Sequence, residues 1–469
     1  MSHHPVFLLI LALAATVQRP LLADEKTRSS RWNLLLITAD DLNADSAGWL
    51  GDRHGATPNL DAFARSAHRF RQAHVTVPIC QPGREALLTG RVPHRSGALG
   101  FNPIRKDVPT LVEVLNAAGY HTGAIAKTAH MMPATKFPWH ETGGQELGKK
   151  PRAFRDRLRE MMDSARSKGK PFFINANITD PHRPFVAESA DNKQADLPKV
   201  FKAGQVAVPA FLEDLPEARR EVAQYYSSVS RFDLTFGMVL DALRDTGRAD
   251  DTVVLFLSDH GMSFPFAKAT VYRNGTWSPV LLKYPGMGQP QEREELVSSV
   301  DIMPSLLELL GVEPPTGMDG RSWVSLLKGR AQPDRDLVVT HVNTVSSGKS
   351  FAQRCARTRD RALIYHAWAG GETPFRVEAM SGLTFAAMNK SGDPGIKARI
   401  RQLVAGETLM LFDTSADPSE RRNLIREPAW AGEAGELSRR LLDHMRKTED
   451  PLTEAFGKAW EDHNRRKPG

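Results

Sequence analysis

WNLLLIT, at residues 32–38, is an uninterrupted apolar run that ends just before Asp40 and Asp41. Two later runs also lead into polar residues: PFFINANI (171–178) precedes Asp180-Pro181-His182, and TVVLFL (252–257) precedes Asp259-His260. Continuous apolar runs of this length are typical of parallel strands that are buried on both faces of a sheet. In open α/β sheets, ligands bind beyond the carboxyl ends of the strands, so three such clusters together predict one site.

Segments with helical periodicity lie between these strands and after them. The dipeptide Thr57-Pro58 is typical of a helix start, and apolar residues follow it at helical spacing up to Phe70. Further helices are predicted at 110–118, 217–243 and 301–310, and a further short strand at 122–126. Strands that alternate with helices predict an α/β sandwich around a large, mainly parallel sheet.

The pattern changes beyond residue 340. Short predicted strands at 362–366 and 409–412 are separated by Gly-rich and charged loops, and a final helix is predicted at 435–446. We therefore divide the chain into a main domain at 24–340 and a smaller α+β subdomain at 341–469 that packs on it.

The first 23 residues have the character of a secretory signal. Residues 6–17 form an apolar run that is too short for a membrane span, and Ala23 marks the expected cleavage position. His3 and His4 stand where basic residues are usual, so an uncleaved membrane anchor remains the alternative. No later segment approaches about 18 apolar residues. We expect a secreted or periplasmic protein without stable membrane association after cleavage.

The composition is that of an ordinary globular protein. Hydrophobic residues make up 41% and charged residues 25% of the chain, which excludes collagenous, disordered and polytopic membrane classes. The formal net charge of +7 favours an anionic partner, which could be nucleic acid, an anionic surface or a polyanionic substrate. Because the sequence contains no basic stripe, aromatic platform or known nucleic-acid module, we expect no nucleic-acid binding. The oligomeric state stays open.

Asp40, Asp41 and Asp259 would bring three carboxylates to one edge of the sheet. Adjacent carboxylates raise one another's pKa unless a cation neutralises them, and a hard oxygen environment suits Ca²⁺ or Mg²⁺. His260 adds an imidazole nitrogen, which suits Zn²⁺ or Mn²⁺ better, so spacing alone leaves the metal open. The alternative is that Asp40 or Asp41 only caps a helix.

The chain contains two cysteines, Cys80 and Cys355, and a disulfide between them is the default expectation for an exported protein. The residues around Cys80 favour a different role. Cys80-Gln81-Pro82-Gly83-Arg84 is followed by Leu88-Thr89-Gly90-Arg91. Together these segments resemble the signature of the sulfatase family, although Gly83 stands where the family more often has Ser or Ala.

The resemblance to sulfatases implies a fold and a nucleophile. The family has an alkaline-phosphatase-like α/β/α sandwich, and its cysteine is converted to formylglycine by a formylglycine-generating maturation enzyme. The hydrate of that group is the nucleophile, so Cys80 would be catalytic and would also contact the metal. The resemblance further implies that Asp40, Asp41, Asp259 and His260 bind this metal, with Ca²⁺ expected and Mg²⁺ or Mn²⁺ as alternatives.

The resemblance also implies roles for several basic residues. Lys127, Lys268 and His182 match positions that contact the sulfate oxygens, and Arg84 would support the ionised formylglycine hydrate. His182 is the first candidate for the proton donor to the leaving group. His130 is the second, since the family often shows Lys-x-His where this chain has Lys-x-x-His. Taken singly, each of these residues would more often be an ordinary surface lysine or loop histidine.

Three stretches are closer to one branch of the family, the heparan N-sulfatases (sulfamidases): 171–184, 223–257 and 411–424. The leading hypothesis is therefore metal-dependent removal of sulfate from a sulfated carbohydrate, with an N-sulfoglucosamine-type substrate favoured. The alternatives are a carbohydrate O-sulfatase or arylsulfatase, a phosphoester or phosphonate hydrolase of the same superfamily, and a glycan-binding relative whose Cys80 is never converted. His341 and Arg354, in the subdomain that would shape the far wall of the site, are candidate substrate contacts.

Overall fold

Eight strands form the main sheet of the structure, a computed structural model that describes residue 1, residues 31–188 and residues 197–465. The three apolar runs form neighbouring strands at its centre: β1 (Asn33–Asp40) lies between β6 (Phe172–Pro181) and β7 (Thr252–Ser258) and is parallel to both. Every residue of these three strands is buried, as continuous apolar runs predict. Their carboxyl ends therefore meet at one edge of the sheet.

The sheet is mostly but not wholly parallel. Its strand order is β5-β4-β6-β1-β7-β8-β2-β9, and β8 is antiparallel to both of its neighbours. The remaining bounds are β5 (Glu141–Gly143), β4 (His121–Ile125), β8 (Val280–Lys283), β2 (His68–Phe70) and β9 (Glu292–Arg293). A separate two-stranded sheet pairs β3 (Ala73–His74) with β10 (Val297–Ser298).

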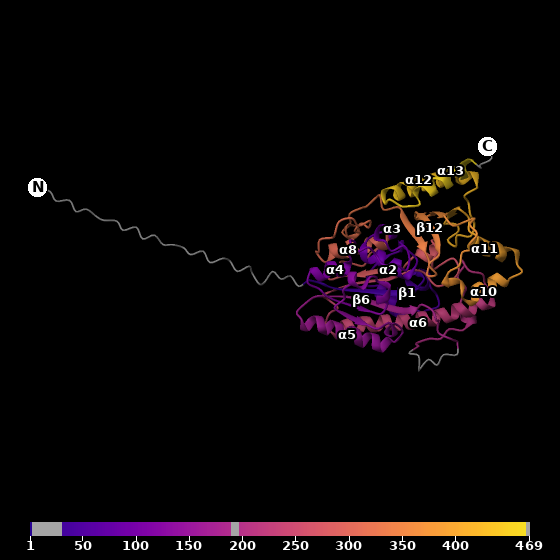
Figure 1. Cartoon of the computed structure of the whole chain (residues 1–469). Helices are drawn as coiled ribbons and strands as arrows, with labels where there is room; N and C mark the ends of the chain where they lie inside the picture. Colours follow the sequence, from indigo (N-terminus) through magenta and orange to yellow (C-terminus); the bar gives the residue numbers. More distant parts are fainter. Residues whose placement is uncertain (2–30, 189–196, 466–469) are drawn as a thin grey trace. The chain divides into compact units, whose positions relative to one another are not determined.

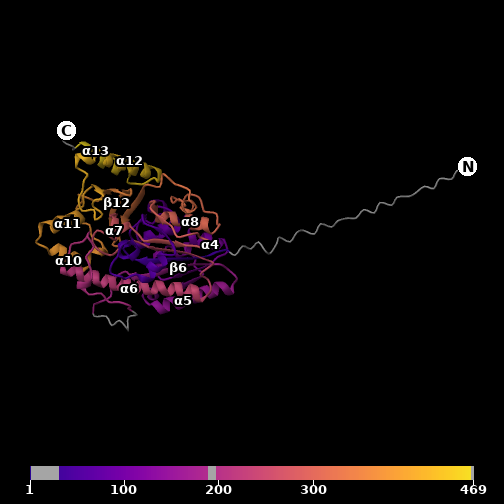
Figure 2. The same cartoon turned by 180° about the vertical axis from the view of Figure 1, so that it is seen from behind.

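The two faces of the main sheet carry separate hydrophobic cores. Because side chains alternate along a strand, Leu35 of β1 joins one core and Leu36 joins the other. Helices cover both faces, and those along the first face lie side by side (Figures 1 and 2). These are α5 (Pro151–Ser167) and α6 (Pro216–Asp245) on the first face, and α4 (Leu111–Ala117) and α8 (Ile302–Leu309) on the second.

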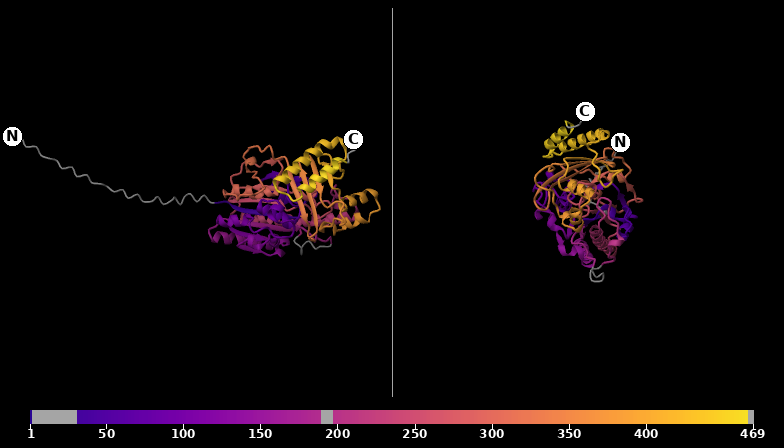
Figure 3. Two further views of the ribbon diagram at one scale, coloured as in Figure 1. Left: turned by 45° about the horizontal axis from the view of Figure 1, so that its top comes forward. Right: turned by 90° about the vertical axis from the view of Figure 1, so that its right-hand side faces the viewer.

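A second, antiparallel sheet of four strands follows the main one in sequence: β11 (Val338–Thr344), β12 (Ser350–Arg357), β13 (Arg361–His366) and β14 (Leu409–Asp413). One face of it contributes Cys355 and Ile364 to the first core of the main sheet. The other face packs against α12 (Ala431–Lys447), which α13 (Thr453–Arg465) follows, as Figure 3 shows. The boundary that we predict between residues 340 and 341 falls within β11, and the division into two domains stays a prediction.

The remaining α-helices of the described chain are α1 (Pro58–Ala64), α2 (Cys80–Thr89), α3 (Pro93–Ser96), α7 (Arg273–Thr276), α9 (Val324–Leu327), α10 (Leu383–Lys390) and α11 (Pro394–Val404). The expectation that helical spacing continues from Thr57 to Phe70 is wrong, because the helix ends at Ala64 and Phe70 lies in β2. Phe63 packs in one core and Phe70 in the other, which a single continuous helix could not achieve.

No helix among the described residues is both long and apolar enough to cross a bilayer. The signal peptide that we predict at residues 1–23 lies, apart from Met1, outside the described residues.

Candidate active site

Two of the three polar clusters meet at the carboxyl edge of the main sheet. The backbone N–H of Asp41 donates a hydrogen bond of 3.1 Å to Oδ1 of Asp259, across the parallel pair β1 and β7. Nδ1 of the fully buried His260 lies 3.4 Å from Oδ1 of Asp41. Asp40 is also fully buried. The four predicted metal-binding residues of these strand ends are therefore brought together.

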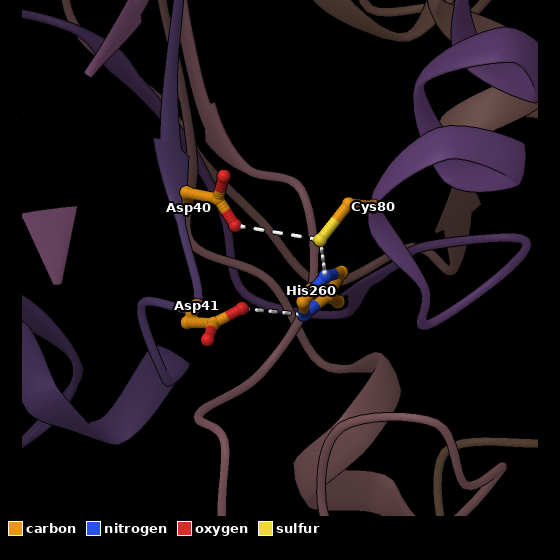
Figure 4. A group of neighbouring side chains, drawn as sticks. All are labelled: Asp40, Asp41, Cys80 and His260. Carbon is orange, nitrogen blue, oxygen red and sulfur yellow. Dashed lines mark hydrogen bonds and ion pairs between the residues drawn. The ribbon is translucent and has the colours of Figure 1, made fainter. Parts of the chain in front are cut away.

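Cys80 is the first residue of α2, and its sulfur faces the same edge. Sγ lies 3.6 Å from Oδ1 of Asp40 and 3.2 Å from Nε2 of His260. Figure 4 shows the side chains of Asp40, Asp41, Cys80 and His260 converging from the strand ends and from the start of the helix. The helix N-terminus carries partial positive charge, so this position favours an anionic atom.

Arg84 lies one helical turn after Cys80 and links three strands of the main sheet through hydrogen bonds. Its guanidinium donates to Oδ2 of Asp259 at 2.8 Å, to Oγ1 of Thr38 at 2.9 Å and to Oδ1 of Asn177 at 2.6 Å. It also lies 3.5 Å from Oδ2 of Asp40. Because only 3% of the side chain is exposed, Arg84 holds the acidic pairs in place from inside the protein.

Two lysines also contact the first acidic pair. The ammonium group of Lys127 forms an ion pair with Oδ2 of Asp40, and that of Lys268 lies 2.9 Å from Oδ1 of Asp41. Asp41 and Lys127 both have left-handed backbones, with φ of 69° and 55°. A non-glycine residue in this region costs about 1–3 kcal/mol, and such strain clusters at functional sites.

The third polar cluster is divided between two roles. The carboxylate of Asp180 accepts hydrogen bonds of 2.6 and 2.9 Å from Arg231 of α6, so it does not join the other acids. Nδ1 of His182 donates to the carbonyl of Arg183 at 2.6 Å. Burial lowers the pKa of this imidazole, but Asp41, Asp40 and Cys80 together outweigh burial and raise it to about 9. His182 therefore belongs to the group around the sulfur.

His130 lies at the margin of this group. It ends the 3-10 helix η4 (Thr128–His130), and its ring packs edge-on against Phe101 with the ring centroids 5.9 Å apart. Among the contacts of the described residues, none joins its side chain to Cys80 or to the acidic pairs.

The site is a network of ionised groups. Burial lowers the pKa of Lys268, but Asp41 and the other anionic groups around it together outweigh burial and raise this pKa well above its usual value. Burial and Asp40 oppose ionisation of Cys80, yet Lys268, His260 and Lys127 together hold the pKa of the thiol well below its usual value. Positive charge thus dominates around the sulfur, which suits an anionic nucleophile and an anionic substrate.

The same residues fit a divalent cation. Burial raises the pKa of Asp41, and burial together with Asp40 raises the pKa of Asp259 to about 6, so an added positive charge would stabilise both carboxylates. Oδ2 of Asp40 and Oδ1 of Asp41 accept no well-aligned hydrogen bond from the described residues and are held in ion pairs with Lys127 and Lys268. One ligand atom from each of Asp40, Asp41, Cys80 and His260 lies within 4.8 Å of the others, which is close enough for a shared ion after small adjustments.

His341 and Arg354 are placed differently from the expected substrate contacts. Both are fully buried in the second sheet. Arg354 holds the carboxylate of Asp450 through bonds of 2.5 and 3.0 Å, and Nδ1 of His341 lies 3.8 Å from the same carboxylate. Because neither side chain reaches the surface, we correct the expectation that they contact substrate and assign Arg354 to the packing of this sheet.

The two cysteines are both free, so the default expectation of a disulfide is wrong. Cys355 is buried in β12 within the first hydrophobic core, and burial raises the pKa of its thiol to about 12. It is an inert core residue, in contrast to Cys80.

Gly83, which departs from the usual signature, fits the local backbone of this chain. A Cβ atom at this position would lie 2.6 Å from the carbonyl oxygen of Val77. Ser or Ala here would require the backbone at Val77 to move.

Several residues of the site are absent from the predicted set. Thr38 and Asn177 bind Arg84, and the signal for them is a polar residue within an otherwise apolar strand. Lys149 donates to the carbonyl of His182 at 2.6 Å. Glu378 lies 3.3 Å from Lys268 and 3.7 Å from His182, and nothing in the surrounding sequence marks it.

Two family models match the chain. The sulfatase model matches residues 32–312, and the model described as N-sulphoglucosamine sulphohydrolase, C-terminal, matches residues 259–366.

Similar proteins and structures agree with these matches. Human N-sulphoglucosamine sulphohydrolase is 29% identical, over 89% of this chain and 91% of its own length. Human arylsulfatase A is 28% identical, over 89% of this chain and 86% of its own. A solved structure in complex with its substrate D-glucosamine-2-N,6-O-disulfate has a TM-score of 0.69 at 17% identity and covers 90% of this chain and 99% of its own.

A phosphonate monoester hydrolase from Silicibacter pomeroyi has a TM-score of 0.65 at 21% identity, over 90% of this chain and 97% of its own. These structural matches establish the fold, the alkaline-phosphatase-like sandwich. The family match spans more than half of the chain and includes Cys80 and both acidic pairs. The chain therefore belongs to the sulfatase family, whose members hydrolyse sulfuric esters or sulfamates.

Proposed function

We propose that this protein removes sulfate from a sulfated carbohydrate, with an N-sulfoglucosamine-type substrate favoured, and that Cys80 acts as formylglycine. The observation that carries the proposal is the position of the Cys80 sulfur, 3.2 Å from His260 and 3.6 Å from Asp40 at the edge where Lys127 and Lys268 converge. Formylglycine at this position would supply a hydrated aldehyde, one hydroxyl of which attacks sulfur while the other allows sulfate to be expelled afterwards.

The cation in this proposal is Ca²⁺, with Mg²⁺ or Mn²⁺ as alternatives, and it would be held by Asp40, Asp41, Asp259, His260 and the converted residue 80. Such an ion would polarise a sulfate oxygen and lower the pKa of the attacking hydroxyl. Carboxylate oxygens dominate the set of donors, which favours a hard cation over Zn²⁺.

The chain's own cations perform the remaining steps. A sulfuryl group that undergoes displacement spreads negative charge over its oxygens, so fixed positive groups stabilise the transition state more than the bound substrate. Lys127, Lys268 and His182 would hold these oxygens, and Arg84 would keep residue 80 and Asp259 aligned. His182 would give the proton on Nε2 to the leaving atom. His130 is a second proton donor in the proposal only if its side chain turns toward the site.

The favoured substrate rests on similarity to named relatives. The C-terminal family model and the human relative both carry the name N-sulphoglucosamine sulphohydrolase, and a structure with the same fold binds a disulfated glucosamine. Carbohydrate O-sulfatase and arylsulfatase activities are the alternatives within the family. The fold is shared with a phosphonate monoester hydrolase, so a phosphoester or phosphonate hydrolase is the alternative outside it.

The proposal includes export and maturation. The apolar run at residues 6–17 supports a signal that would deliver the protein to the periplasm or the medium. Conversion of Cys80 would require the formylglycine-generating enzyme to act before α2 folds, because the side chain of Cys80 is buried in the folded chain.

One experiment tests the proposal at two levels. The protein is produced in a host that has the maturation enzyme, and the peptide containing residue 80 is examined by mass spectrometry. The same preparation is assayed for sulfate release from N-sulfoglucosamine, O-sulfated glucosamines and an aryl sulfate, with an aryl phosphate as the competitor. We expect formylglycine and sulfate release, and none from the Cys80→Ala variant. A peptide that remains wholly thiol would leave the glycan-binding alternative, and a preference for phosphate would replace the proposed activity.

A further inference from the structure

Among the described residues after His260, Glu378 is the one carboxylate that forms ion pairs with Lys268 and His182. It begins the 3-10 helix η9 (Glu378–Met380), and its Oε2 lies 3.3 Å from Nζ of Lys268. Its Oε1 lies 3.7 Å from Nε2 of His182. The side chain of Glu378 is 38% exposed, whereas that of Lys268 is 4% exposed. Glu378 is therefore more exposed than both cations and lies at the outer edge of the group.

The negative charge of Glu378 does not favour contact with the sulfate group. Lys268 and His182 are cations that the proposed function directs at sulfate oxygens, and a carboxylate next to those oxygens would repel them. Glu378 contacts both cations and is more exposed than either, so a substrate whose sulfate is held by Lys268 and His182 would place its sugar on the side of Glu378. A carboxylate there accepts hydrogen bonds and attracts positive charge.

The segment that contains Glu378 is anchored to the loop that contains His182. The carboxylate of Glu221, on α6, accepts the backbone N–H groups of Leu383 and Thr384 at 3.0 and 2.7 Å. The same carboxylate accepts a hydrogen bond of 2.7 Å from Arg183, the residue after His182. Glu221 thus fixes the segment of Glu378 against that of His182, and their proximity is built into the fold.

We infer that Glu378 binds the leaving nitrogen of a sulfamate and selects sulfamates over sulfate esters. This inference rests on the proposed function. When a sulfamate is hydrolysed, the N–S bond breaks and its electron pair stays on nitrogen. Water supplies the oxygen that sulfur gains and the two hydrogens that nitrogen gains, so the products are sulfate and an alkylammonium ion. An ester instead releases a neutral alcohol, for which a carboxylate offers no charge-assisted hydrogen bond.

The test compares two substrates in the mature enzyme. We expect Glu378→Gln to lower kcat/KM for N-sulfoglucosamine by at least about tenfold more than for 6-O-sulfo-N-acetylglucosamine. Glu372→Gln is the matched control, since Glu372 is an exposed carboxylate on the same connection after β13. It should leave both values unchanged.

Product inhibition gives a second measurement that needs no variant. Glucosamine carries the ammonium group and N-acetylglucosamine does not, so glucosamine should inhibit the wild type more strongly. This difference should disappear in Glu378→Gln. Equal losses on both substrates, or equal inhibition by the two sugars, would overturn the role of Glu378 and leave the sulfatase proposal intact. A mature wild type without activity on any sulfated substrate would overturn both.

Discussion

Nη2 of Arg84 donates a hydrogen bond of 2.8 Å to Oδ2 of Asp259, and both side chains are almost completely buried. A buried ion pair of this kind contributes little net stability by itself, because desolvation offsets the attraction. Its removal on one side is costly, since the remaining charge has no partner. In this chain the remaining charge would belong to an acidic pair of the active site.

Arg84→Ala should therefore destabilise the fold as well as abolish activity. Removing the buried guanidinium that pairs with Asp259 is expected to lower the free energy of unfolding by about 3–5 kcal/mol. Denaturant unfolding followed by circular dichroism measures the loss. Arg439→Ala is the control, because Arg439 forms ion pairs only on the exposed surface of α12 and should be nearly neutral. A small effect of Arg84→Ala would mean that water enters and solvates Asp259.

Calcium should stabilise the folded protein through Asp40 and Asp41. A ligand that binds only the native state adds about 2.7 kcal/mol at a concentration one hundred times its Kd. We expect the thermal midpoint to rise with added Ca²⁺ and to fall on chelation. In Asp41→Asn, which keeps the shape of the side chain, the response to Ca²⁺ should be weak or absent. A thermal midpoint that does not change with Ca²⁺ but rises with Mn²⁺ would identify Mn²⁺ as the metal.

The pH dependence of turnover should contain an alkaline limb that belongs to His182. Burial lowers the pKa of this imidazole, but Asp41 and Asp40 outweigh burial and raise it to about 9. The imidazolium that donates a proton is therefore present at neutral pH and is lost as the pH rises through this value. A bound cation would weaken the attraction of both acids and move the limb to lower pH. His182→Gln should slow turnover and remove the limb, and a profile that keeps it would assign the proton to another group.

The central part of the site could be predicted because its residues follow strong local patterns. Asp40, Asp41, Asp259 and His260 come directly after apolar runs, and the strand order β6-β1-β7 makes those ends neighbours. Cys80 and Arg84 belong to one short segment whose spacing is retained when it forms the start of a helix. In both cases a local pattern determined the tertiary position.

The outer part of the site has no such signal. Glu378 reaches Lys268 through a loop that is anchored by Glu221, and this long-range arrangement leaves no periodicity around residue 378. The prediction that Arg354 contacts substrate was wrong for a different reason. A polar residue after the main domain suggested a substrate contact, whereas the antiparallel register of β12 turned it inward toward Asp450. Side-chain direction on an unpredicted strand was the missing information.

Glu85 should make the stability of the protein fall as the pH rises. This fully buried carboxyl accepts hydrogen bonds from the backbone of Met132 and from Gln81, but burial outweighs them and raises its pKa to about 8. Since the folded-state pKa lies above the unfolded value, the folded state holds the proton more tightly. Stability is then lost between about pH 4.5 and pH 8, at up to roughly 1.4 kcal/mol per pH unit.

Urea unfolding of the wild type and of Glu85→Gln at several pH values in this window isolates that contribution. The variant cannot ionise at position 85, so the difference in stability between the two proteins should shift in its favour as the pH rises and then level off above about 8. Parallel curves for the two proteins would show that Glu85 is ionised at neutral pH in the folded chain.

The pair Arg354 and Asp450 should affect stability and leave substrate affinity alone. Both side chains are fully buried, and Arg354 also donates to Oδ1 of Asn343 at 2.9 Å. Arg354→Met leaves the carboxylate of Asp450 unpaired beside His341, so the free energy of unfolding should fall by about 3–5 kcal/mol. KM for the best substrate, measured on the folded fraction, should not change.

Adding Asp450→Asn to Arg354→Met separates the two roles. The second change removes the unpaired charge, so the double variant should regain part of the stability that the single variant lost. A substrate contact would behave in the opposite way, because the double variant would still lack the guanidinium and KM would stay high. A raised KM for Arg354→Met with unchanged stability would thus restore Arg354 as a substrate contact and require the second sheet to open toward the site.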